Sequence, residues 1–165
     1  MFYRAHCLVR FELMGADGRA QMVWAFLEEI ALVVNGAHTP TASEWRRWIE
    51  AGGSRRPRGV FVYSFGGGPS SAQRTETVAL MEKLRYVPTT VMVTSSVVAR
   101  GAITAMSWFV PPAKRAKVFA PAEIEDAFAE LGLPEAARRR IYERLTELAD
   151  TVDRPPGTLP QRQPS

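Results

Sequence analysis

Apolar residues along this chain form short continuous runs that alternate with stretches of helical periodicity. The runs at 30–34, 60–65 and 90–93 are rich in β-branched and aromatic residues, as is typical of strands covered on both faces. Strands that alternate with helices indicate right-handed βαβ units. The pattern therefore predicts an α/β fold with a mostly parallel central sheet and helices packed on it.

Two of the expected helices begin with capping-box spacing, in which a hydroxyl and a residue three positions later each satisfy an orphan amide. Thr41 with Glu44 begins the first of these helices, which we expect to end at glycines 52–53. Ser70 with Gln73 begins the second. The apolar residues with helical spacing, expected to face inward, are Trp45, Trp48, Ile49, Leu80, Met81 and Leu84.

The ends of the chain extend this arrangement. Residues 2–14 and 21–26 flank a strong turn signal at 15–18, which predicts an N-terminal antiparallel hairpin. After the strand at 90–93 we expect a third helix that ends near residue 109, followed by an edge strand at 117–120. Two further helices are expected to begin at Pro121 and Pro134, with Gly132 between them.

One domain accounts for the chain. Residues 1–152 are expected to form it, including a C-terminal helix, and the Pro-, Gln- and Arg-rich stretch 153–165 is expected to be a disordered tail. The start of the chain lacks the features of a secretory signal, and the apolar stretch at 22–34 is too short to span a bilayer. Cys7 is the only cysteine, which fits the reducing cytoplasm.

The net charge of +4 raises the question of nucleic-acid binding. The excess lies in two clusters, at 55–58 and 138–140, and neither cluster has interleaved aromatic residues. The second is followed on its helix by Glu143 and Glu147, as on a solvated surface. This distribution argues against nucleic acid as the partner.

The order of elements, a hairpin followed by strand–helix units over residues 20–132, resembles the STAS-like domains of bacterial anti-sigma-factor antagonists. The turn at 62–71 and the end of the third helix at 107–109 also carry the resemblance. Members of that family act mainly by binding proteins, and several are switched by phosphorylation of a serine at a helix start. The resemblance places Ser70 and Ser71 at that position, although no Asp precedes them here.

Ligands of open α/β sheets tend to lie beyond the carboxyl ends of the strands, and those ends are small and polar here. Helix starts at Ser70 and Ser95 would direct unpaired amides into one crevice. Ordinary helix capping explains the same residues. The candidates for an anion or phosphoacceptor site are His38, Gly66, Gly67, Gly68, Ser70, Ser71, Arg74, Ser95, Ser96 and Arg100.

Known catalytic patterns do not fit the chain. The three glycines at 66–68 are not followed by the Gly-Lys-Ser/Thr of a Walker A loop, and they do not match Gly-x-Gly-x-x-Gly. His6 and His38 lack metal-ligand spacing, and Ser64 lacks a nucleophile elbow. We therefore expect no enzyme activity, no cofactor and no metal.

These observations favour a non-enzymatic, STAS-like module that binds another protein or has a regulatory role. Two alternatives stay open. One is a small anion-binding or hydrolytic protein that uses the strand-end crevice. The other is a self-associating structural protein, a homodimer for example, that pairs through a strand edge left open by the hairpin.

Overall fold

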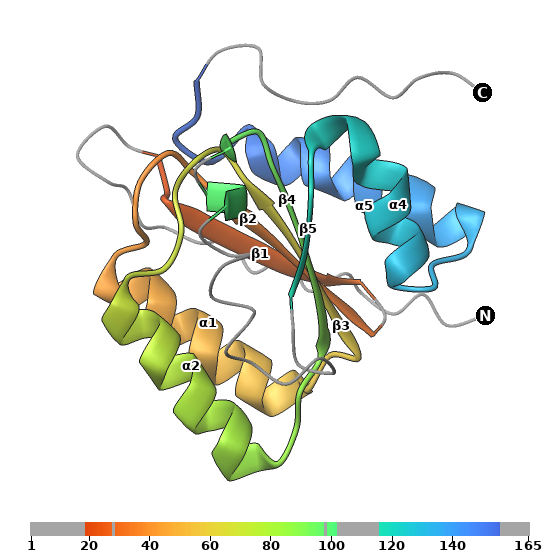
Figure 1. The fold of residues 1–165 in the computed structure, drawn as a ribbon. Coiled ribbons are helices and arrows are strands. Elements are labelled where there is room, and N and C mark those ends of the chain that lie inside the picture. The colour runs from red at the N-terminus through yellow and green to blue at the C-terminus, as the bar shows by residue number, and fades with distance from the viewer. Residues whose placement is uncertain (1–18, 28, 98, 102–115, 156–165) are drawn as a thin grey trace, which may run out of the picture.

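The structure is a computed structural model that describes residues 19–27, 29–97, 99–101 and 116–155. Its centre is a five-stranded sheet in the order β1-β2-β3-β4-β5, in which β1 and β2 are antiparallel and the other neighbours are parallel (Figure 1). The predicted α/β fold class is confirmed. The strands are β1 (Met22–Leu27), β2 (Ile30–Asn35), β3 (Gly59–Ser64), β4 (Thr89–Thr94) and β5 (Lys117–Phe119).

The antiparallel part of the sheet contains a strand pairing that was not predicted. β1 turns back directly into β2, with Leu27 opposite Ile30. Both strands were predicted. The predicted hairpin partner of residues 21–26, residues 2–14, lies outside the described residues together with the turn at 15–18. β1 is therefore the antiparallel neighbour of the strand that was expected to be the first central strand.

Helices cover both faces of the sheet. α1 (Ala42–Arg55) and α2 (Ser71–Leu84) lie side by side on one face, and α4 (Ile124–Glu130) and α5 (Glu135–Ala149) lie on the other (Figure 1). A short 3₁₀ helix, η2 (Pro121–Glu123), leads into α4. Positions 97 and 99–101 are helical, while most of the expected third helix, including residues 107–109, lies outside the described residues.

The first helix is longer than predicted. α1 continues through glycines 52–53 to Arg55, and Arg56 caps it in the left-handed conformation with a φ of 46°. A Cβ at Gly53 would contact the side chains of Leu80 and Leu84 at 3.7–3.9 Å, so this position lies close to α2. Hydrogen bonding within the helix outweighs the conformational cost of two glycines, about 1 kcal/mol each.

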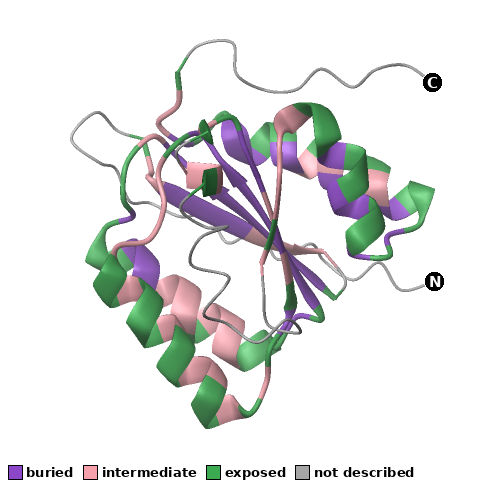
Figure 2. Ribbon diagram, viewed as in Figure 1, coloured by how far each residue is buried: buried purple, intermediate pink, exposed green. Residues whose placement is uncertain are grey.

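The two faces of the sheet carry two separate cores. On the α4 and α5 side, Phe61 stacks on Phe128 with 5.1 Å between the ring centroids, within a large cluster of buried residues. On the α1 side, a smaller cluster contains Val33, Val62 and Trp45. Figure 2 shows the same asymmetry, because α2 carries no buried residue at all. Of α1, α2, α4 and α5, only α2 has no buried residue.

The C-terminal end of the described chain returns to the sheet. The amide of Asp153 donates to the carbonyl of Ala20 at 3.0 Å, and its carbonyl accepts the amide of Ala37 at 2.8 Å. Asp153, the first residue of the expected tail, is therefore hydrogen-bonded to the folded domain. Residues 156–165 of that tail lie outside the described part. No helix among the described residues is long and apolar enough to cross a membrane.

Candidate functional site

The carboxyl edge of the parallel strands ends in a row of polar side chains. Asn35, Ser64 and Thr94 are neighbours in register, and all three are buried. Because side chains alternate along a strand, this row faces the same side as Val33 and Val62, which is the α1 side. The oxygen Oδ1 of Asn35 is buried and has no hydrogen-bond partner among the described residues.

The loops above this row pack tightly on one another. The amide of Gly67 donates to the carbonyl of Gly36 at 2.9 Å, and a Cβ at Gly67 would lie 2.1 Å from the carbonyl oxygen of His38. Gly66 has a φ of +124°, which only glycine adopts readily. A Cβ at Gly68 would meet nothing within 4 Å. Two of the three glycines therefore have a structural reason, and neither reason involves a ligand.

Ser70 caps α2 as the spacing predicted. Its Oγ accepts the amide of Gln73 at 3.3 Å, and Gln73 Oε1 accepts the amide of Ser70 at 2.8 Å. The Gln73 side chain also donates to the carbonyl of Pro40 at 2.9 Å, which ties α2 to the preceding loop. Ser71 and Arg74 are exposed, and Arg74 donates to Pro69 O at 2.6 Å and to Ser71 Oγ at 3.1 Å.

The third polar loop is likewise closed on itself. Ser96, rather than Ser95, is the capping residue, because its Oγ accepts the amide of Ala99 at 3.1 Å. Arg100 turns back and donates to the carbonyl of Thr94 at 2.8 Å. Both candidate arginines thus bond to carbonyl oxygens of their own turns and do not meet in a common anion site.

His38 lies apart from these serines. Its side chain is 75% exposed, and Nε2 is 3.7 Å from a carboxylate oxygen of Asp153. Its backbone amide donates to Gln21 at 3.1 Å. The loops therefore join through backbone contacts and the Gln73–Pro40 bond, whereas the predicted site side chains do not converge. No cluster of three metal-ligating side chains occurs in the part of the chain that the structure describes.

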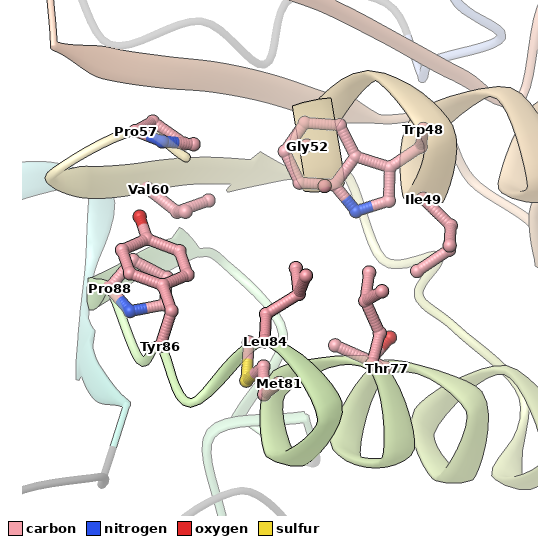
Figure 3. A pocket seen from close by; sticks show the side chains of 12 residues that line it. Trp48, Ile49, Gly52, Pro57, Val60, Thr77, Met81, Leu84, Tyr86 and Pro88 are labelled. Carbon is pink, nitrogen blue, oxygen red and sulfur yellow. The ribbon is translucent and has the colours of Figure 1, made fainter. Parts of the chain in front are cut away.

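A second feature, a groove between α1 and α2, was not predicted. Trp48 and Ile49 of α1 face Thr77, Met81 and Leu84 of α2 across it, as Figure 3 shows. The hollow of the groove has a volume of about 60 Å³ and is open to solvent. The remaining lining residues are Gly52, Gly53, Pro57, Val60, Leu80, Tyr86 and Pro88.

The wall of the groove is apolar and incompletely buried. Leu80, Met81 and Leu84 are half-buried, and neighbouring Val78 is 53% exposed. The hydroxyl of Tyr86 is buried and lacks a hydrogen-bond partner among the described residues. Burial raises the pKa of that hydroxyl, while the guanidinium of Arg56 acts in the opposite direction.

The two basic clusters are partly neutralised within the fold. Arg58 pairs with Glu29 at 3.2 Å and also donates to Leu131 O at 3.1 Å. Arg138 pairs with Glu125 at 3.4 Å. Arg58 and Arg138 thus contact other elements of the fold.

The sequence predicted the apolar residues that line the groove, on the two helices, as inward-facing core residues. What the sequence did not show is that α1 and α2 leave their facing stripes only half covered. Comparison of the chain with protein-family models, with curated proteins and with solved structures gives no match.

Proposed function

We propose that this chain is a non-catalytic module that binds another protein through the groove between α1 and α2. The observation that supports this proposal is the state of α2, a helix of 14 residues without a single buried side chain. Its apolar stripe covers α1 only in part. Apolar surface that stays exposed at a concave site is typical of protein interaction sites.

The size of the cavity favours a side chain over a small molecule as its occupant. An apolar cavity that takes up benzene measures about 150 Å³. The cavity here is about 60 Å³. One apolar side chain of a partner, with the remainder of its contact along the two helices, suits these dimensions.

The hydrogen bonds within the strand-end loops also favour the groove over these loops as the binding site. The hydroxyl of Ser70 and the guanidinium groups of Arg74 and Arg100 are already engaged by local groups, which leaves little to hold an anion. We also propose STAS-like membership on the order of elements, and such domains act mainly by binding proteins. The single cysteine supports the cytoplasm as the place of that interaction.

Site-specific photo-cross-linking tests the proposal. A photoreactive phenylalanine analogue replaces Met81, which lines the groove, or Ala79, which is exposed on the opposite side of α2. In the native cell, we expect adducts with a different protein from position 81 and none from position 79. Leu80→Asp should abolish the adduct from position 81, whereas Ala79→Asp, with the same change in charge, should not.

The outcome also separates the alternatives. An adduct twice the mass of the chain would replace the proposal with self-association through this groove. The absence of any adduct from position 81, in a variant that keeps the thermal midpoint of the wild type, would overturn the proposed contact surface.

A further inference from the structure

The two helices that frame the groove end in the same unusual way. Arg56 caps α1 with a φ of 46°, and Arg85 caps α2 with a φ of 49°. Among the described residues these are the only two non-glycine positions with positive φ. Glycine or asparagine is the common residue at such positions, because a side chain is strained there.

The helix dipole does not explain these arginines. A cation in the last turn of a helix is favourable, but Arg55 and Lys83 already lie in the last turns of α1 and α2. Neither guanidinium, of Arg56 or of Arg85, has a hydrogen bond or an ion pair within the described ranges. Other arginines of the same surface are engaged, as the Arg58–Glu29 pair shows.

Both arginines lie at the same end of the groove. α1 and α2 connect parallel strands of one sheet, so both helices end at the edge opposite the strand-end loops (Figure 1). Four basic residues and one acidic residue lie in the last turns and caps at this end, namely Arg55, Arg56, Lys83, Arg85 and Glu82. Tyr86, whose hydroxyl lacks an acceptor among the described residues, follows Arg85 in the groove wall.

We infer that the partner segment is acidic: it places an apolar side chain in the groove and carboxylates beside Arg56 and Arg85. This inference rests on the proposed function and adds the chemistry of the partner. The apolar lining of the groove would supply affinity for the partner segment. The guanidinium groups of Arg56 and Arg85 at one end would set its orientation and the specificity for acidic partners. The occupant is thus a segment of a second protein in which aspartate or glutamate flanks a large apolar residue.

Selection from a library of random peptides tests the inference. A phage-displayed library of peptides about 15 residues long, enough for a four-turn helix, is selected on the folded wild-type chain. We expect enrichment of peptides that combine Leu, Phe or Trp with several carboxylates. Binding of these peptides should be lost with Leu80→Asp and kept with Ala79→Asp.

Charge variants then isolate the arginines. Arg56→Gln/Arg85→Gln should weaken the selected peptides about two- to thirtyfold at low ionic strength, as for two exposed ion pairs. The difference should shrink in high salt. Arg19→Gln/Arg139→Gln removes the same charge from exposed positions outside the groove and should leave affinity unchanged.

A second pair of variants guards against loss of the fold. Arg56→Gly/Arg85→Gly suits the left-handed caps, so this chain should melt no lower than the wild type while binding the peptides as weakly as the Gln variant. Groove-dependent peptides without acidic residues would overturn the inference and leave the proposed function standing. No groove-dependent peptide at all would overturn both.

Discussion

Glu44, in the first turn of α1, accepts the backbone amide of Gln21, which precedes β1, through Oε1 at 2.8 Å. Its other oxygen accepts the amide and the hydroxyl of Thr41, at 2.7 and 2.8 Å. One buried carboxylate therefore joins the start of a helix to the start of an edge strand. The capping-box spacing predicted only the local half of this arrangement, the contact between Thr41 and Glu44.

Replacement of Glu44 should destabilise the chain more than loss of an ordinary cap. Glu44→Ala removes the charged acceptor of the Gln21 and Thr41 amides, and a hydrogen bond to a charged group contributes about 1.5–3 kcal/mol. Thr41→Ala should cost about 1 kcal/mol, because it removes the cap hydroxyl alone. Chemical denaturation of both variants compares the free energies of unfolding, and equal losses would contradict the bridging role of Glu44.

Adjacent glycines in the turn after β3 should respond differently to alanine. Gly67→Ala forces a Cβ against the carbonyl of His38, and we expect a loss of about 1–3 kcal/mol or more from this overpacking. Gly68→Ala enters open space and should change stability by less than about 0.5 kcal/mol. Thermal melting of the two variants provides the measurement. A tolerated alanine at 67 would show that the two loops can separate.

Ser70 distinguishes a structural loop from a functional one. Ser70→Ala removes the cap of α2 and should cost about 1 kcal/mol, whereas Ser70→Asp keeps an acceptor and suits the positive helix end. Because the groove ends with Arg56 and Arg85 at the opposite edge, neither change should alter affinity for the groove peptides. Affinity is measured for both variants against the wild type. A loss of binding with Ser70→Asp alone would return the strand-end loop to the binding surface.

Tyr63 should make the fold sensitive to alkali. Burial, and secondarily Tyr142, raises the pKa of its hydroxyl to about 12 from 10.0, although Arg154 acts against this. Between those pH values the unfolded chain releases a proton that the folded chain keeps, so the free energy of unfolding falls as pH rises. This contribution is complete below about pH 10, and up to about 3 kcal/mol is lost as pH rises through 12.

Denaturant titrations across that pH window provide the measurement for Tyr63. Tyr63→Phe should flatten the dependence of stability on pH but not remove it, since burial also raises the pKa of Tyr86. An unchanged slope in the Phe variant would show that other groups cause the alkaline loss.

Features set by neighbouring residues were predictable from the sequence. Both capping boxes, the three parallel strands at 30–34, 60–65 and 90–93 and the two C-terminal helices are confirmed, because each depends on local spacing or on a short apolar pattern. The antiparallel pairing of β1 with β2 was not predictable in this way. An apolar stretch can pair with either flanking strand, and no turn residue marks the short connection between Leu27 and Ile30.

The candidate site was harder to predict than the helices and strands, because it depends on how distant parts of the chain pack together. The sequence placed Ser70, Arg74 and Arg100 near strand ends, but the direction of each guanidinium is decided by nearby carbonyl oxygens. The groove depends on the spacing of two helices. The spacing of Leu80 and Met81 in the sequence is the same whether α1 covers the apolar stripe of α2 completely or leaves it half exposed.

The absence of buried side chains in α2 also affects how this helix should move. A helix without buried side chains, fastened to the neighbouring loop by the Gln73–Pro40 bond, loses little contact when it lifts away. The α4 and α5 face, with Phe61 and Phe128 fully enclosed, resists such opening. Amide hydrogens in α2 should therefore exchange with solvent through local excursions long before those of the strands. We therefore expect the groove between α1 and α2 to change its width when a partner binds, while the core under α4 and α5 keeps the molecule folded.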